Sequence, residues 1–414
     1  MRFIFAIFLA WAACAQTPAQ IPVIFVHGNG DDATKWTPIL WLFASNGYPA
    51  DRLHAIRLTD PSARRDNSKP EPFRSSTTDQ ASELSALVTR VLLESKASKV
   101  ALVGSSRGGM TIRNYLKNAG GAAVVSHAVL CGTPNHGVLA MDTNLDMEFN
   151  GKGHFLRQLN EGSELVDGVK FMTLRSDKLD KYAQPNVGYD GPELKGAENV
   201  VLPGLDHREV AFHRDAFAAM YRFLTGAPPK LLEVTPEATP QISGLVTGFG
   251  AGAPTNRPLA GVRLRIFALK AEGATRDGNP LLDTTTNETG TWGPLPVDPG
   301  KNYEFNLEKE GRTVNYFMSG LLRSNPIFNL RFVPVGGGPG QLTIHRPQGY
   351  FSKGRDPVLV DGKELQEVPA GIPTADSVTI KLDKPVLVGL RKESIAARPS
   401  SSPQELNIAE LIWE

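Results

Sequence analysis

The stretch KVALVGSSRGGMTIRNYL, residues 99–116, decides the fold of the first half of the chain. An apolar, β-branched run ends at Gly104-Ser105-Ser106-Arg107-Gly108, and a helical pattern follows directly. Small residues two before and two after a serine allow a sharp turn between a strand and a helix, which exposes the serine oxygen above the sheet. Such a hydroxyl becomes a nucleophile only if a base takes its proton and a third group orients the base. The stretch therefore predicts Ser106 as a nucleophile that needs a histidine and an acid elsewhere in the chain.

Candidate bases lie in GLDHREVAFH, residues 204–213, after a predicted strand that ends near Leu202. His207 lies in the loop that directly follows the strand, where a base is expected. His213 begins the last helix of this half, so we interpret it as a capping residue. We expect Asp206 to shape the loop rather than to serve as the acid.

Candidate acids lie in RSDKLDKYAQP, residues 175–185, after another predicted strand. We prefer Asp180, because Pro185 soon after it resembles the usual end of an acid loop. Asp177 lies closer to the strand and remains the alternative acid. With either aspartate, the chain order of serine, acid and histidine is the one found in α/β-hydrolases.

An oxyanion intermediate needs two backbone N–H donors. One is expected from Arg107, the residue after the nucleophile. The other is expected from VIFVHGNGDD, residues 23–32, where Asn29 follows an early strand. His27 in this loop is interpreted as structural, and the loop lacks the Lys-Ser/Thr pair of a nucleotide-binding loop.

Strand and helix patterns alternate from residue 20 to residue 227 and predict a catalytic domain with a mostly parallel sheet covered on both faces. A proline-containing linker is predicted at 228–239. Beyond it the apolar period changes to two, as in GVRLRIFAL, which predicts an all-β region of one or two sandwich or barrel modules. We divide that region into 240–335 and a second small β unit at 336–414.

The N-terminal segment has one basic residue, an apolar core too short for a membrane span, and Ala13-Cys14-Ala15 before Gln16. This pattern predicts a signal peptide at residues 1–15 and a secreted or periplasmic protein. Lipid anchoring through Cys14 is the alternative. The 44 basic and 43 acidic side chains nearly cancel, which argues against nucleic acid as a partner.

VIFVHGNG, VALVGSSRGG and LCGTPNHG together resemble the oxyanion loop, nucleophile elbow and following strand of the α/β-hydrolase lipases and esterases, in particular the small bacterial type. The whole chain is similar to secreted archaeal-type lipases that carry a C-terminal β-domain. This resemblance implies Ser106, His207 and Asp180 as the triad, with Asn29 and Arg107 as oxyanion donors. An arginine beside the nucleophile departs from the family pattern and indicates substrates that carry a negative group.

The sequence thus predicts a secreted serine hydrolase of carboxylic esters that uses no cofactor and no metal. Ester or lipid is the expected substrate, and the β-modules are expected to contact a lipid interface or a polymer. The alternatives are a polyester depolymerase and a catalytically silent hydrolase fold used for adhesion. We expect the β-modules to act as tethered binding modules, so that a chain that ends near Gly226 still hydrolyses short soluble esters but loses activity on long-chain or insoluble ones.

Overall fold

The structure is a computed structural model that describes residues 20–183, 188–270, 273–334 and 337–412. The predicted signal peptide at 1–15, with Cys14, lies outside the described residues. Within the described ranges, no helix combines the length and the apolar character that crossing a membrane requires.

The first half is built on a six-stranded sheet in which every strand pair is parallel. The strand order is β2-β1-β3-β4-β5-β6, so the chain changes direction across the sheet between β1 and β3. Where the strand order reverses in this way, the loops that follow the two neighbouring strands, here β1 and β3, run in opposite directions and leave a crevice between them. In open α/β sheets this crevice is the usual ligand-binding place. The strands are β1 (Val23–Val26), β2 (Leu53–Ala55), β3 (Val100–Ser105), β4 (Val125–Cys131), β5 (Lys170–Ser176) and β6 (Glu198–Leu202).

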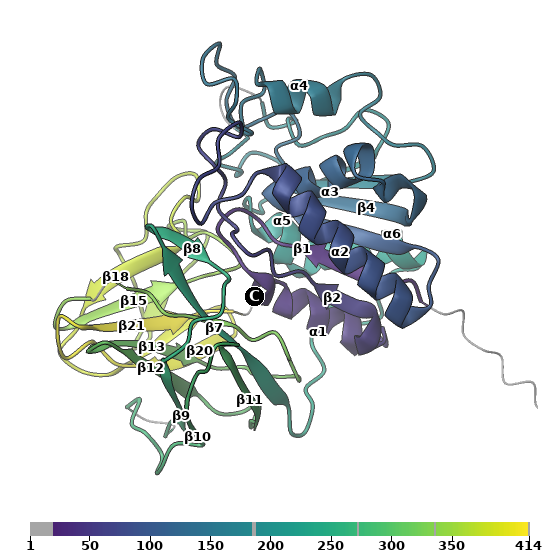
Figure 1. The fold of residues 1–414 in the computed structure, drawn as a ribbon. Helices are drawn as coiled ribbons and strands as arrows, with labels where there is room; N and C mark the ends of the chain where they lie inside the picture. Colours follow the sequence, from purple (N-terminus) through teal and green to yellow (C-terminus); the bar gives the residue numbers. More distant parts are fainter. Residues whose placement is uncertain (1–19, 184–187, 271–272, 335–336, 413–414) are drawn as a thin grey trace, which may run out of the picture.

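Helices cover both faces of this sheet, which confirms the predicted fold class (Figure 1). On one face, α1 (Thr37–Ser45) and α6 (Arg214–Thr225) contribute to a core with the apolar side chains of β1 and β3. On the other face, α2 (Thr77–Ser95) and α3 (Arg107–Asn118) do the same. Two shorter helices, α4 (His154–Asn160) and α5 (Glu209–Phe212), lie in the connections.

The second half is all β, as predicted, and its largest sheet has seven strands. Their order is β10-β9-β12-β13-β21-β15-β18. The strands are β9 (Arg263–Ala268), β10 (Leu282–Thr285), β12 (Tyr303–Lys309), β13 (Arg312–Met318), β15 (Gln341–His345), β18 (Ser377–Lys381) and β21 (Glu405–Glu410). The last strand, β21, pairs in parallel with β13 on one side and with β15 on the other. One sheet therefore joins the two stretches that we separated at residue 335.

Two smaller sheets complete this β-region. One contains β7 (Gln241–Gly250), β8 (Ala253–Thr255), β11 (Thr291–Pro296) and β14 (Leu330–Arg331). The other contains β16 (Leu359–Val360), β17 (Lys363–Glu364), β19 (Val386–Leu390) and β20 (Glu393–Ala397). We call residues 240–412 the β-region from here on.

The β-region lies beside the first half (Figure 1) and forms hydrogen bonds with it, so it is more than a tethered module. The connecting segment itself lies against the end of α1, where Asn46 Oδ1 accepts the backbone N–H groups of Lys230 and Leu231. Further hydrogen bonds join the halves directly. Thr34 Oγ1 donates to Ile327 O over 2.8 Å, Asn325 Nδ2 donates to Thr37 Oγ1 over 2.7 Å, and Trp41 Nε1 donates to Ser324 O over 3.1 Å. These contacts contradict the expectation of a loosely tethered module.

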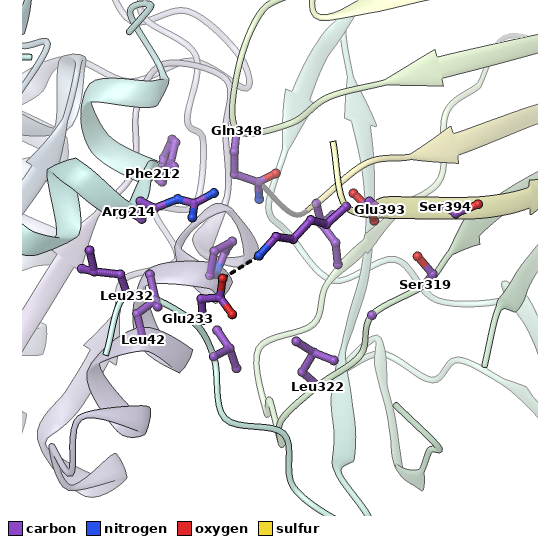
Figure 2. A pocket seen from close by; sticks show the side chains of 15 residues that line it. Leu42, Phe212, Arg214, Leu232, Glu233, Ser319, Leu322, Gln348, Glu393 and Ser394 are labelled. Atoms are coloured by element: carbon purple, nitrogen blue, oxygen red, sulfur yellow. Dashed lines mark hydrogen bonds and ion pairs between the residues drawn. The ribbon is translucent and has the colours of Figure 1, made fainter. Parts of the chain in front are cut away.

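A cavity of about 390 Å³ lies where the two halves meet (Figure 2). Leu42 and Phe212 line it from the first half, and Leu322 and Gln348 line it from the β-region. An ion pair between Lys392 Nζ and Glu233 Oε1, 2.6 Å long, joins the β-region to the connecting segment here. Both of these side chains are largely exposed, so the pair contributes little to stability.

Candidate active site

Ser106 lies at the turn between β3 and α3, with a φ of 52° and a ψ of −122°. A positive φ is costly for a residue with a side chain and persists only where the surroundings enforce it. Here the flanking glycines allow the turn. A Cβ on Gly104 would lie 2.6 Å from Gly109 N, and one on Gly108 would lie 2.4 Å from Val26 O. The close packing of this turn is therefore the physical reason for the Gly-x-Ser-x-Gly spacing.

His207 lies between Ser106 and Asp180, and each of its two ring nitrogens is within hydrogen-bond distance of one of them. Its Nε2 is 3.0 Å from Ser106 Oγ, and its Nδ1 is 2.8 Å from Asp180 Oδ2. His207 and Asp180 are both buried. The second oxygen of Asp180 accepts the backbone N–H of Tyr182 over 2.8 Å, which fixes the carboxylate. A base that takes a proton from a hydroxyl and is oriented by a buried carboxylate needs this geometry.

Asp177, the alternative acid, is not in this line. Its Oδ1 accepts the backbone N–H groups of Lys178, at 2.7 Å, and of Gly204, at 3.3 Å. Asp177 therefore connects the loop after β5, which contains both aspartates and which we call the acid loop, to the loop after β6, which contains His207 and which we call the histidine loop. The structure brings Asp180, and not Asp177, to His207.

The two predicted oxyanion donors lie beside Ser106, at the point between β1 and β3 where the strand order changes. Asn29 lines the same pocket as Ser106, and its side-chain Oδ1 accepts the N–H of Ala63 over 2.7 Å. Among the described residues, the backbone N–H groups of Asn29 and Arg107 form no hydrogen bond with a backbone carbonyl. The His27 ring holds the loop, as expected: Leu58 N–H donates to its Nε2, and burial lowers its pKa.

The Arg107 side chain does not face the substrate, which corrects the expectation that it selects negatively charged esters. It is fully buried and forms an ion pair with Glu148. Its Nη1 donates to Pro61 O over 3.0 Å. The guanidinium therefore ties together the connections behind the nucleophile and leaves only its backbone N–H to the site.

The pocket in front of Ser106 has a volume of about 120 Å³. Its lining includes the apolar side chains of Pro134, Val138 and Phe149. It also includes the charged side chains of Asp31 and Arg208. Burial tends to raise the pKa of Asp31, but Lys35 and Arg208 outweigh burial and lower it to about 2.

Asp31, Arg208 and Tyr350 are among the lining residues of this pocket to which sequence reasoning assigned no role. Asp31 and Arg208 lie in the same short stretches as Asn29 and His207, so that proximity was the available signal. Tyr350, which comes from the β-region, had no local signal. In the part of the chain that the structure describes, no three histidine, cysteine or acidic side chains are grouped as ligands for a metal ion.

The turn that carries His207 is closed by two hydrogen bonds around the histidine. Asp206 Oδ1 accepts the backbone N–H of Glu209 over 3.0 Å, and Glu209 Oε2 accepts the backbone N–H of Asp206 over 2.8 Å. This reciprocal pattern has the form of a capping box and lies in the turn that leads into α5, so we call it the capping box of the histidine loop. It confirms that Asp206 shapes the loop. His213 accepts the N–H of Asp215 at the start of α6, so its capping role is also confirmed.

Comparison with known proteins connects this site to a family. Residues 20–140 match the family model described as lipase (class 2), and residues 239–334 match the one described as lipase C-terminal domain. The two matches together cover more than half of the chain.

Similar solved structures include three bacterial or archaeal proteins. A mature lipase of Bacillus licheniformis is 19% identical, with a TM-score of 0.40 over 50% of this chain and 94% of that one. The phospholipase PlaB of Legionella pneumophila is 15% identical, with a TM-score of 0.37 over 76% and 93%. A monoacylglycerol lipase of Paleococcus ferrophilus is 12% identical, with a TM-score of 0.36 over 50% and 96%.

Proposed function

Since the chain belongs to the α/β-hydrolase lipase family and is a carboxylic-ester hydrolase, we propose that it works through a Ser106-His207-Asp180 triad and a covalent acyl-enzyme. The observation that carries the proposal is the hydrogen-bonded line from Ser106 Oγ through the His207 ring to Asp180. A silent copy of the fold has no need of a nucleophile, a base and an acid held in one line.

The first half of the reaction transfers the acyl group to the enzyme. His207 Nε2 takes the proton of Ser106 Oγ as the oxygen attacks the ester carbonyl carbon. The backbone N–H groups of Asn29 and Arg107 bind the oxyanion that forms. His207 then gives its proton to the leaving alcohol oxygen, the C–O bond breaks, and Ser106 carries the acyl group. Asp180 stabilises the charged imidazole throughout.

In the second stage of the reaction, deacylation, the same catalytic groups act on a water molecule. His207 removes a proton from a water molecule, and the resulting oxygen nucleophile attacks the acyl carbon. The proton returns to Ser106 Oγ as the bond to the acyl group breaks and the carboxylic acid leaves. These steps use no metal and no cofactor.

The dimensions of the site support a short group beside Ser106. A volume of about 120 Å³ holds roughly four water-sized groups. A neighbouring cavity of about 420 Å³ shares Asn29, Asp31 and Arg208 with this pocket and is otherwise lined largely by the β-region. We infer that larger lipid or polyester substrates place their remaining part there.

Export is part of the proposal. The apolar segment and the small residues at 13–15 support a cleaved signal peptide and a secreted or periplasmic enzyme, and lipid anchoring through Cys14 is the alternative. Mass spectrometry of the exported protein separates the two, because cleavage at Ala15 leaves Gln16 as the first residue.

The test of the catalytic proposal is hydrolysis of a p-nitrophenyl ester series by the wild type and by Ser106→Ala. Loss of the nucleophile is expected to cost roughly 10⁴-fold or more in rate, because nucleophile and base act as a unit. A fluorophosphonate should label Ser106 and no other residue. Label at another site, or a Ser106→Ala enzyme that keeps a few per cent of its activity, contradicts the assignment.

A further inference from the structure

The two carboxylates of the capping box around His207 also contact the β-region. Asp206 Oδ2, the oxygen that the capping box does not use, accepts Arg355 Nη2 over 2.9 Å and the backbone N–H of Tyr350 over 2.7 Å. Glu209 accepts Arg355 Nη1 on Oε2 over 2.6 Å and Arg346 Nη2 on Oε1. Asp206 and Glu209 are both fully buried. Each carboxylate therefore connects the backbone of the histidine loop to the β-region.

Arg346 and Arg355 are also held in place by hydrogen bonds within the β-region itself. Asp356 accepts Arg355 Nε over 2.8 Å and Arg346 Nη1 over 3.2 Å. The carbonyl oxygen of Tyr350 accepts both guanidinium groups, at 2.7 and 2.8 Å. Arg346 is fully buried, and the Arg355 side chain is 20% exposed. A planar guanidinium with several fixed acceptors cannot rotate, so it presents a rigid surface to the loop.

The arginines act differently on the two carboxylates. Burial alone raises the pKa of Glu209, yet the charges of Arg346 and Arg355 outweigh burial and lower it to about 2. The pKa of Asp206 is raised, because burial and the neighbouring Glu209 charge outweigh the same two arginines, so the geometry of its hydrogen bonds carries its part of the argument. Removal of one partner from a buried ion pair leaves an uncompensated charge, which is strongly unfavourable. Asp206 and Glu209 therefore keep their positions only while the arginines keep theirs, and His207 lies between them in the chain.

We propose that Arg346 and Arg355 are positioning residues for His207, so that the β-region holds the base in its hydrogen bond with Ser106. This inference rests on the proposed function, in which His207 is the base. It assigns the β-region a part in the chemical step, in addition to any part in binding. A displacement of about 1 Å at a reacting group can cost roughly 100-fold in rate, so loss of this support should lower kcat more than it raises KM.

The experiment compares three substitutions in the full-length enzyme. Arg355→Gln removes the one guanidinium that hydrogen-bonds to both Asp206 and Glu209, and leaves Arg346 in place. Arg355→Lys keeps the charge but cannot make every contact of the guanidinium at once. Lys392→Gln is the control, because it also breaks an ion pair of the β-region, here with Glu233 of the connecting segment, where both side chains are largely exposed. Each protein is measured for kcat and KM on p-nitrophenyl butyrate, for the rate of fluorophosphonate labelling, and for Tm.

We expect Arg355→Gln to lower both kcat and the labelling rate by roughly 10- to 100-fold, with a change in KM of less than about 3-fold. Arg355→Lys should recover part of the loss, and Lys392→Gln should match the wild type. A folded Arg355→Gln enzyme with wild-type kcat overturns the proposal, and so does an equal loss in Lys392→Gln.

If Arg355→Gln does not fold, Asp206→Asn carries the test, because asparagine keeps the acceptor oxygen of the capping box but removes the charge that faces Arg355. A loss of kcat at nearly unchanged Tm supports the proposal, and wild-type kcat overturns it. Failure of the proposed function looks different. In that case Ser106→Ala itself stays active, whereas failure of this inference alone leaves Ser106→Ala inactive and the Arg355 variants active.

Discussion

Tyr350 donates its backbone N–H to Asp206 Oδ2 over 2.7 Å, and its side chain lines the pocket in front of Ser106. The loop of the β-region that contains Tyr350 is thus both a support of the histidine loop and a wall of the site. Because this residue belongs to the second half of the chain, the site is complete only when both halves are in place.

The acid is the first catalytic role to test. Asp180→Asn should lower kcat by roughly 10⁴-fold, because an amide favours the wrong tautomer of His207 and removes the charge that stabilises the imidazolium. Asp177→Asn should cost only a few-fold, since Asp177 contacts backbone N–H groups and not His207. Steady-state kinetics on a short p-nitrophenyl ester measure both variants. The reverse ranking would assign the acid role to Asp177.

Tyr350 should limit the size of the substrate group that lies beside Ser106. Tyr350→Ala removes the ring from a pocket of about 120 Å³, so the preference should shift toward bulkier acyl or alcohol groups. The measurement is the ratio of kcat/KM for octanoate and butyrate esters. Tyr350→Phe serves as the control, because it keeps the ring and should leave the ratio within about 2-fold. An unchanged ratio in Tyr350→Ala would show that the ring does not bound the substrate site.

The parts of this site that sequence could predict are those that local chain geometry dictates. The Ser106 turn needs its glycines within two residues of the serine. Each buried strand is recognisable as an apolar run, so the position of the loop that follows it can be predicted. Ser106, His207, Asn29 and the two candidate acids could therefore be named from short stretches alone. Sequence favoured Asp180 through the position of Pro185 but left Asp177 open, because both aspartates lie in one loop and only the packing of that loop against the histidine loop separates them.

The contributions of the β-region could not be predicted, for a different physical reason. Asp206 and Tyr350 are 144 residues apart, and no periodic pattern connects an arginine in one half to a carboxylate in the other. The same holds for β21, which lies between β13 and β15 through parallel pairing over a long sequence separation. Local patterns predict which segments form strands, but not which strands pair at that distance.

Cys131 should be unreactive in the folded protein. It ends β4 in full burial, and burial raises the pKa of its thiol, so the reactive thiolate is suppressed at neutral and mildly alkaline pH. In a chain that begins at Gln16 it is the only cysteine. An Ellman titration should therefore detect no thiol in the native protein and one thiol in denaturant. Rapid reaction of the native protein would show that the sheet opens at β4.

Removal of the β-region should destroy the enzyme, contrary to the sequence-based expectation of a short-ester hydrolase that ends near Gly226. The truncation removes the arginine partners of Asp206 and Glu209, so the histidine loop loses its ion pairs with the β-region. An ordinary domain is stable by only about 5–15 kcal/mol, so a large newly exposed apolar surface is enough to unfold it. Trp41 and Phe212, which are buried in the full-length chain, lie at the interface between the halves and would become partly exposed to water.

The expected outcome of the truncation is an insoluble or unfolded product, assessed by solubility, circular dichroism and fluorophosphonate labelling. Co-expression of residues 228–414 as a separate chain should restore labelling at Ser106, because the missing partners act through non-covalent contacts. A soluble truncation that hydrolyses butyrate esters at the wild-type rate would contradict both the stability argument and the positioning role of the arginines.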